Sequence, residues 1–447
     1  MYNEINKVEK LTKEERDFLE KNLRICFDVI VESTGAKSFD IENDMGNKEK
    51  FLKEFSPWHQ KKGKGQELIQ KFVDIVNNDQ STEDFSWLDI LDEDSQWKKP
   101  GNDKIKKEVK DKSKHVNMRY QIPTHFHGDI DNAVLFYCME NPRGYLGDYK
   151  DSKIDEEFQG ETLNEFYIYS ANKRLEESKT LKEIVKERYQ LNDFTTDSIE
   201  KIIYSNSKDE TPLRRELENM FKENKEFFGK TYILKKDKRS KKPVLSDKYY
   251  YISRYYAQLL EINGENLKKY NIESEDKKEA QEAQVEQDKA IKISEKICNV
   301  EIYPFSSSEP KLEGKGIGNT ILLNSDLSRL GAYIVLRRIY RYLNDKTEKP
   351  VKPVIVFRKY DRAWKELFDK ILQEVEEEEK QKDRTFEHEK VLNLLEEGFF
   401  YCQTGSMGGG ITDGNVISVP NFKRISDELK ETKEKDFKSI KSLLTKE

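Results

Sequence analysis

Apolar and polar positions follow one another in two ways along this chain. Short continuous apolar runs, each followed at once by polar or turn-forming residues, are typical of strands covered on both faces of a parallel sheet. Residues 133–139, 297–303, 353–357 and 398–403 have this pattern and are predicted to be strands. The first of them ends in Glu140, Asn141, Pro142, Arg143 and Gly144, where the proline and glycine stop the strand sharply.

Helical spacing of apolar residues dominates elsewhere. Thr12 and Glu15 have the spacing of a capping box and predict a helix start, and 51–55 and 67–76 also have helical patterns. Residues 92–114 are polar and rich in Lys and Asp, which favours a linker or exposed excursion. The segment from Asp148 to about Lys296 is mostly helical by pattern, as are 327–343, 364–381 and a last segment that starts near Asn421.

These elements predict an α/β fold with a short, mostly parallel sheet. An N-terminal helical region with a polar linker occupies 1–115. The α/β core takes 116–150 and 297–447, and a mainly helical insertion at 151–296 interrupts it.

The insertion joins a basic stretch at 235–242 to an aromatic stretch at 249–256. Such a pair could bind phosphates and stack bases. A solvated loop followed by a core helix is the favoured interpretation, with Tyr251, Tyr255 and Leu259 on one face. Residues 265–296 lack a sustained apolar stripe and predict an exposed helix.

Charge and cysteine usage limit the partners and the compartment. The formal net charge is −6 and the pI is about 5.8, so any contact with DNA must come from a local basic patch. The four cysteines are widely spaced, which favours buried free thiols in a reducing cytoplasm. No apolar run is long enough for a membrane span and the first residues are not signal-like. We therefore expect a cytoplasmic protein without membrane contact. The helical insertion could bind a protein partner.

Familiar cofactor motifs are absent from the sequence. The glycines at 408–414 lack the lysine and spacing of a P-loop, and those at 314–318 do not match a dinucleotide fingerprint. His125 and His127 lie close together but have no convincing acidic partner, so they are interpreted as turn or surface histidines. We expect no metal and no cofactor.

The chemistry is instead expected in loops that follow the predicted strands. Ligands of open parallel sheets bind just beyond the carboxyl ends of the strands. Such loops hold Glu140 to Arg143, Phe305 to Ser308, Arg358, and the residues from Ser406 to Asn415.

The order of these motifs resembles that of the uracil-DNA glycosylase superfamily. Gly128-Asp129 precedes a buried strand that ends in the Asn141-Pro142 turn. A strand ending in Pro304-Phe305-Ser306, an apolar strand ending at Arg358 and a Gly/Asn loop at 410–415 follow in the same order as in that superfamily. The resemblance covers 118–150 and 297–429.

The resemblance implies a three-layer α/β/α sandwich with a base-binding pocket at the strand ends. Asn141 would position the attacking water or contact the base, and Glu140 would assist as a base. Phe305 would stack on a flipped base, and Ser306 or Ser307 would bind that base or a phosphate. Arg143 and Arg358 would hold phosphates. The remaining predicted substrate-binding residues are Pro142, Tyr145, Ser406 and Asn415.

Two departures keep a second interpretation open. The superfamily's His-Pro-Ser-like loop is replaced at 404–415 by a segment without histidine, and Arg143 stands where a small glycine is usual. One hypothesis is a DNA base glycosylase that acts on a modified base, in a role such as defence against phage DNA. The alternative is a non-catalytic module that senses a nucleotide or DNA, or binds a protein, on the same fold.

Overall fold

The computed structural model describes most of the chain. The described residues are 11–36, 38–60, 63–79, 85–94, 122–140, 180–189, 191–222, 234–236, 243–245, 249–262, 267–305, 325–404, 409–422 and 429–446. Among these residues, no helix combines the length and apolar character needed to cross a membrane.

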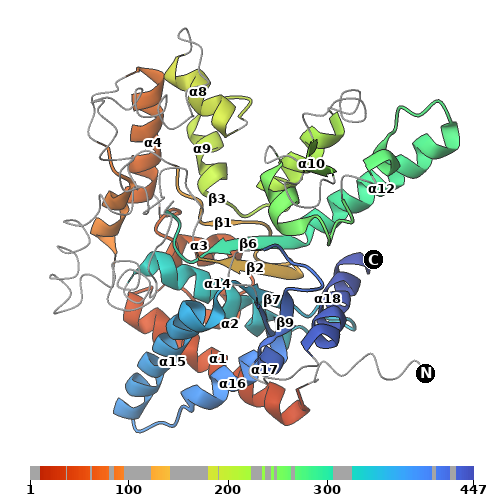
Figure 1. Ribbon diagram of the computed structural model, residues 1–447. Coiled ribbons are helices and arrows are strands. Elements are labelled where there is room, and N and C mark those ends of the chain that lie inside the picture. The colour runs from red at the N-terminus through yellow and green to blue at the C-terminus, as the bar shows by residue number, and fades with distance from the viewer. Residues whose placement is uncertain are drawn as a thin grey trace.

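A seven-stranded, mostly parallel sheet lies at the centre of the molecule (Figure 1). Its four middle strands, in the order β6, β2, β7 and β8, are parallel to one another. At one edge β1 runs antiparallel to β6 and pairs with β3, and at the other edge β9 runs antiparallel to β8. The strands are β1 (Phe126–His127), β2 (Leu135–Met139), β3 (Tyr204–Ser205), β6 (Ile297–Glu301), β7 (Val354–Phe357), β8 (Phe400–Gln403) and β9 (Val416–Ser418).

Side chains of the strands alternate between two separate hydrophobic clusters. Phe136 and Cys138 of β2 belong to the first cluster, whereas Leu135, Tyr137 and Met139 belong to the second. Since neighbouring side chains of a strand point to opposite faces of a sheet, both faces of β2 are covered by apolar side chains.

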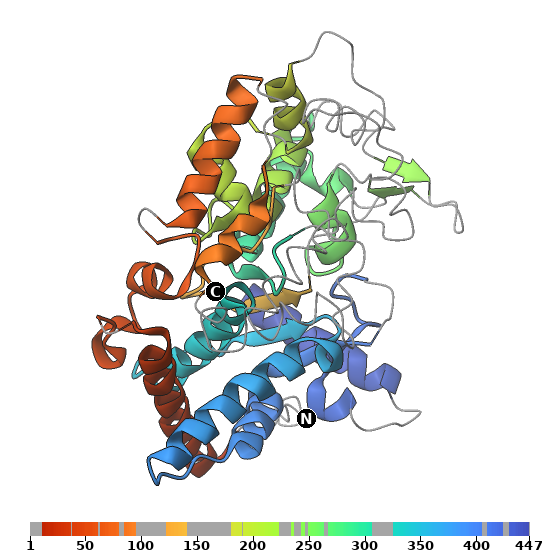
Figure 2. The same cartoon turned by 90° about the vertical axis from the view of Figure 1, so that its left-hand side faces the viewer.

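The first cluster joins the N-terminal helices to helices that follow β6 and β7. α1 contacts α15, next to which it lies in Figure 2, and it also contacts α14 and α16. The elements that contribute to this cluster are α1 (Lys13–Thr34), α2 (Ile41–Asp44), α3 (Lys48–Phe55), α4 (Lys64–Asn77), η1 (Trp87–Glu93), α8 (Leu181–Arg188), α9 (Thr196–Ile203), α14 (Asp326–Leu343), η7 (Tyr360–Arg362), α15 (Trp364–Gln381), α16 (His388–Phe399) and α17 (Val419–Phe422).

The second cluster joins the opposite face of the sheet to helices of the predicted insertion and to the C-terminal helix. Its helical elements are α10 (Pro212–Lys222), η5 (Ile252–Tyr256), η6 (Leu267–Tyr270), α12 (Lys277–Glu295) and α18 (Leu429–Thr445). The insertion also supplies β3 to the central sheet and a separate hairpin of β4 (Leu234–Lys236) and β5 (Pro243–Leu245). Since α8 and α9 of the insertion belong to the first cluster, insertion and core share one sheet and both hydrophobic clusters.

Most predicted elements are present, with small shifts. The capping box of Thr12 and Glu15 begins α1, and α15 has the predicted bounds. The strand predicted at 398–403 begins only at Phe400, because Gly398 and Phe399 end α16. The last helix begins at Leu429 rather than near Asn421, since Asn421 belongs to the short α17. Most of the 92–114 linker lies outside the described residues, and the domain boundaries stay a prediction.

The backbone at Gly128 requires a glycine, which accounts for the Gly-Asp step of the sequence. Its φ is +126°, and a Cβ atom there would lie 2.5 Å from the carbonyl oxygen of Ile297. Asp129 then accepts hydrogen bonds from the backbone N–H groups of Asp131 and Asn132 and shapes the turn into β2. The step therefore lets the chain cross closely over β6 before it enters the sheet.

Candidate functional site

Polar side chains stand at the carboxyl ends of the four parallel strands. Glu301 is the last residue of β6 and is the register partner of Met139, and Glu140 follows Met139 directly. Arg358 follows β7, and its N–H donates to the Cys138 carbonyl of β2. Gln403 ends β8. Because parallel strands end at one edge of a sheet, these four side chains lie along the same edge.

Both carboxyl groups at this edge are withdrawn from solvent. Glu301 is 3% exposed and Glu140 is 4% exposed. Within the described chain, Oε2 of Glu301 lacks a hydrogen-bond partner, whereas Oε1 of Glu140 accepts no hydrogen bond but forms an ion pair with Lys359. A buried carboxyl oxygen without a partner is costly, which makes this edge a candidate for ligand binding rather than for stability alone.

Glu301 holds its proton more strongly than an ordinary glutamate. Burial raises the pKa of its carboxyl to about 8, the positive charge of Arg358 opposes the shift and the carboxyl of Glu140 adds to it. Glu301 is therefore largely protonated at neutral pH.

Arg358 is partly buried beside these groups. Burial opposes its charge, but its neighbours raise the pKa of the guanidinium above the ordinary value. Those neighbours are, in order of effect, Tyr137, Tyr255, Glu140 and Glu301. Arg358 therefore stays a cation, held between carboxyl and hydroxyl groups.

Lys359 turns a second cation toward Glu140. Its backbone is in the left-handed region with a φ of +43°, which is uncommon for a residue other than glycine. Its Nζ atom lies 3.4 Å from Oε1 of Glu140 and the side chain is 44% exposed. The turn after β7 thus places two neighbouring cations, one partly buried and one reaching solvent, beside the same carboxylate.

Tyrosines of the aromatic stretch pack around the second face of the strand ends. The Tyr137 ring of β2 packs edge to face with the rings of Tyr255, at 5.5 Å, and Tyr256, at 5.9 Å. The Tyr256 hydroxyl donates a hydrogen bond to Oδ1 of Asn299 on β6. As the sequence favoured, the described part of this stretch forms core packing, although it adopts a π-helix, η5, rather than a regular α-helix.

Glu216 holds η5 in place from α10. Its two carboxyl oxygens accept the backbone N–H groups of Tyr251 and Ile252 at 3.0 Å each. Burial raises the pKa of Glu216 to about 8, although these hydrogen bonds lower it. The start of η5 therefore depends on one buried carboxyl group.

The glycine-rich loop packs against η5. The Gly410 backbone touches η5 so closely that a Cβ atom would lie 2.5 Å from the carbonyl oxygens of Arg254 and Tyr255. Nε2 of Gln403 donates to the Tyr137 hydroxyl at 3.0 Å and to the Gly409 carbonyl at 2.7 Å. Asn415 Nδ2 donates to the Gly410 carbonyl at 3.1 Å. The predicted residue Asn415 thus supports this loop, which Gln403 joins to the Tyr137 hydroxyl.

Phe305 is packed in the hydrophobic core. Its ring is 1% exposed, packs edge to face on Tyr303 at 5.5 Å and belongs to the first hydrophobic cluster. A base could stack on this ring only after the surrounding chain had moved. The proposed stacking role stays a prediction.

Several predicted site residues lie outside the described residues. They are Asn141, Pro142, Arg143, Tyr145, Ser306, Ser307 and Ser406. Glu140, Arg358 and Asn415 can be placed, whereas Glu301 and Gln403 were not predicted as site residues. Glu301 is a charged residue at the end of the mainly apolar run Ile297-Cys298-Asn299-Val300. This position in the sequence could have identified it as a candidate site residue.

The two histidines are structural. His125 Nδ1 accepts from Trp58 Nε1 and its Nε2 donates to the Leu327 carbonyl, each at 2.9 Å. His127 Nε2 donates to the Ile202 carbonyl at 2.8 Å. Both are at most 1% exposed, and burial lowers the pKa of His125 to about 4 and that of His127 to about 3. The turn or surface interpretation was therefore wrong. No group of three metal-ligating side chains occurs in the described ranges.

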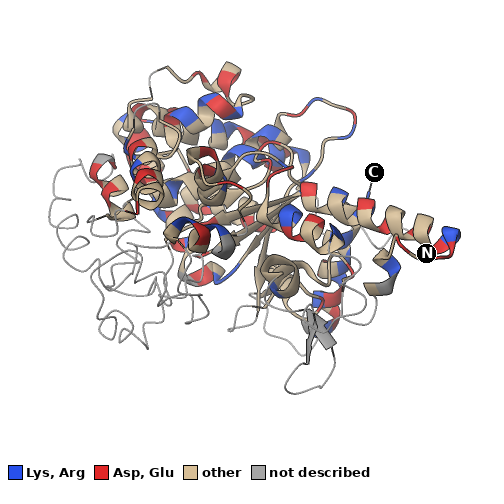
Figure 3. Ribbon diagram, turned by 90° about the horizontal axis from the view of Figure 1, so that it is seen from above, with Lys and Arg blue, Asp and Glu red and all other residues tan. Residues whose placement is uncertain are grey.

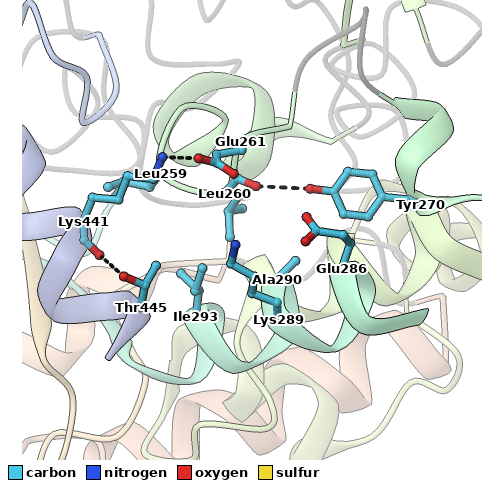
Figure 4. Close-up of a pocket in the computed structure, with 10 residues that line it drawn as sticks. All are labelled: Leu259, Leu260, Glu261, Tyr270, Glu286, Lys289, Ala290, Ile293, Lys441 and Thr445. Carbon is cyan, nitrogen blue, oxygen red and sulfur yellow. Dashed lines mark hydrogen bonds and ion pairs between the residues drawn. The ribbon is translucent and has the colours of Figure 1, made fainter. Parts of the chain in front are cut away.

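A small hollow that is open to solvent lies away from the carboxyl ends of the strands (Figure 4). It is lined by the C-terminal half of α12 and by α18, near the residue where β6 begins. Lys441 forms an ion pair with Glu261, and Tyr270 donates to the Leu260 carbonyl at 3.2 Å. Lys441 and Glu261 neutralise each other, so this pair adds little attraction for a charged ligand.

No protein-family model, curated protein or solved structure matches this chain.

Proposed function

We propose that this protein binds a flipped nucleobase of DNA at the carboxyl ends of β2, β6 and β7 and hydrolyses its N-glycosidic bond. The observation that carries the proposal is the presence of Glu140, Glu301 and Arg358 at neighbouring strand ends. Hydrolysis of a glycosidic bond passes through an oxocarbenium-like sugar, which a nearby carboxylate stabilises.

Glu140, Arg358 and Lys359 each have a defined part in this proposal. Glu140 orients water toward the sugar carbon, together with Asn141, which follows it in the sequence. Arg358 and the more exposed Lys359 hold the phosphates on either side of the flipped nucleotide. These parts follow from the resemblance of the sequence to the uracil-DNA glycosylase superfamily.

The resemblance also proposes a three-layer α/β/α sandwich. Two separate hydrophobic clusters on opposite faces of the sheet, each joined to helices, support that layering. The order of the parallel strands supports the location of the site. After β2 the chain forms β6 on one side of β2, and it then forms β7 and β8 on the other side. β2 and β7 therefore flank a topological switch point.

A non-catalytic DNA- or nucleotide-sensing module is the second candidate. The burial of both carboxyl groups and of the Phe305 ring favours it, because a substrate could reach them only after a rearrangement. Surface charge on the described helices is mixed in sign. Figure 3 shows Lys and Arg interspersed with Asp and Glu on these helices. Arg214, for example, pairs with Asp209, Glu218 and Glu295, so it offers no free charge to DNA.

The test is incubation of the purified chain with DNA from several sources, including phage DNA with modified bases, followed by mass spectrometry of released bases. We expect release that is lost in Asn141→Ala and in Glu140→Gln. The exposed α15 residue Glu378 provides a matched control as Glu378→Gln. Binding of DNA without release from any source would favour the sensing module and overturn the proposed hydrolysis.

A further inference from the structure

Glu301 is the acidic residue of the strand ends that the proposed water activation does not use. It closes β6, its backbone N–H donates to the His125 carbonyl at 2.7 Å, and its side chain is 3% exposed. Oε2 has no hydrogen-bond partner in the described part of the chain. A glutamine or an apolar side chain would fill the same space at lower cost in folding free energy. The carboxyl group of Glu301 is therefore a candidate for a chemical role.

The two carboxyl groups lie on paired strands but have different surroundings. The ladder between β2 and β6 continues past their ends, because the Tyr303 N–H donates to the Glu140 carbonyl at 2.8 Å. Glu140 has the cation Lys359 at 3.4 Å. Glu301 lies among largely buried groups instead, which are Tyr137 and Cys138 of β2, Tyr251, Tyr255 and Tyr256 of or beside η5, Glu140, and Arg358.

We infer that Glu301 donates a proton to the departing base, so that the site takes bases that must be protonated to leave, such as purines with a basic ring nitrogen. This inference rests on the proposed glycosidic hydrolysis. Pairs of carboxyl groups with different surroundings are a general arrangement for acid and base catalysis. The raised pKa of Glu301 agrees with this role, because it keeps the proton in place at neutral pH.

The step balances with water as the only co-reactant. The bond between the sugar carbon and the base nitrogen breaks, and its electron pair stays with the base, which takes the proton of Glu301. Water adds its oxygen to the sugar carbon and loses one proton to the Glu140 carboxylate. Exchange with solvent then returns a proton to Glu301 and removes one from Glu140.

The alternative leaving group is a base that departs as a stabilised anion, such as uracil. Its departure needs no proton, so a residue that only donates one would contribute little to it. Comparison of purine with uracil release therefore separates proton donation from a general structural role of Glu301.

The experiment uses the full chain and oligonucleotides of one sequence that carry adenine, guanine or uracil at a single position. Single-turnover release is measured for the unchanged protein, Glu301→Gln, Glu140→Gln and the control Glu378→Gln. We expect Glu301→Gln to slow purine release by about 10²-fold or more, with a much smaller effect on any uracil release. Glu140→Gln should slow both. Circular dichroism and thermal unfolding establish that each variant is folded.

Three results would overturn the inference while leaving base excision intact. They are unchanged purine release in Glu301→Gln, an equal loss for purines and uracil in the folded variant, and release of uracil alone by the unchanged protein. If the unchanged protein releases no base from any oligonucleotide or natural DNA, the proposed hydrolysis fails and this inference fails with it.

Discussion

Glu301 couples the chemistry of single residues to the stability of the fold. Its pKa is about 8 in the folded chain against an ordinary 4.5. The protonated form is therefore stabilising, and this contribution is fully present below about pH 4.5 and is lost as the pH rises through about 8.

We predict that Glu301→Gln gains stability over the unchanged chain as the pH rises. The amide stays neutral, so the difference in free energy of unfolding between variant and parent should shift by on the order of 1–3 kcal/mol in favour of the variant between about pH 5 and about pH 9. Urea unfolding at several pH values measures it, with Glu378→Gln as the control. A difference that does not change with pH would show that the Glu301 carboxyl titrates normally.

Gly128 gives a second prediction for a single residue. Gly128→Ala should lower the free energy of unfolding by roughly 2–4 kcal/mol, because its Cβ would overlap the Ile297 carbonyl at a φ that side chains disfavour. At Gly46 a Cβ atom would meet no other atom within 4 Å, so Gly46→Ala is the matched control. Equal stability of the two alanine variants, measured by chemical denaturation, would contradict the close crossing over β6.

At the scale of single residues, the sequence predicts site residues that directly follow apolar runs. Glu140 and Arg358 could be predicted because each ends a clear strand pattern. Glu301 and Gln403 could not be singled out, since their roles depend on neighbours from distant segments, such as Tyr255 and Gly409. Burial of His125 and His127 likewise depends on Trp58, Leu327 and Ile202, which no local pattern brings together.

Among the elements, η5 and the glycine-rich loop form one support for the strand ends. The Ile411 N–H donates to the Tyr255 carbonyl at 2.9 Å, and the Asp413 N–H donates to Oε1 of Gln258 at 2.9 Å. Since Tyr255 packs on Tyr137, a change in the loop is transmitted to β2 through packed rings.

We predict that Gly410→Ala separates the loop from η5. A Cβ atom would overlap two η5 carbonyl oxygens, so the free energy of unfolding should fall by roughly 2 kcal/mol and the η5 amides should exchange faster with solvent. Gly414, which has open space around it, is the control. Hydrogen exchange followed by mass spectrometry reads both effects, and unchanged exchange in Gly410→Ala would contradict the contact.

Most helices and strands could be predicted from the local sequence, because burial of one or both faces gives the apolar residues a regular spacing. The π-helical geometry of η5 was not predictable in this way. Its residues have a helical pattern, and the wider turn depends on the cap from Glu216 and on packing against Gly410.

For the whole molecule, the N-terminal helices belong to the main core. α1 contacts α14, α15 and α16, and Trp58 donates to the buried His125 beside β1. A chain that starts at residue 116 would expose the apolar surface that these helices cover.

We predict that a chain of residues 116–447 does not fold by itself. Its unfolding should lack a cooperative transition in urea and it should bind a hydrophobic dye, in contrast to the full chain. Addition of residues 1–115 as a separate polypeptide should restore part of the structure if the interface is as extensive as the cluster implies. A stable fragment that unfolds cooperatively and does not bind the dye would show instead that residues 1–115 form an accessory domain.

The most direct test of the central claim counts products on DNA that the protein acts on. Hydrolysis at the strand ends predicts one abasic sugar for each free base, with both products lost in Glu140→Gln and kept in Glu378→Gln. Equal product formation by Glu140→Gln, or DNA binding with neither product from any DNA, would contradict the claim that these strand-end groups hydrolyse an N-glycosidic bond.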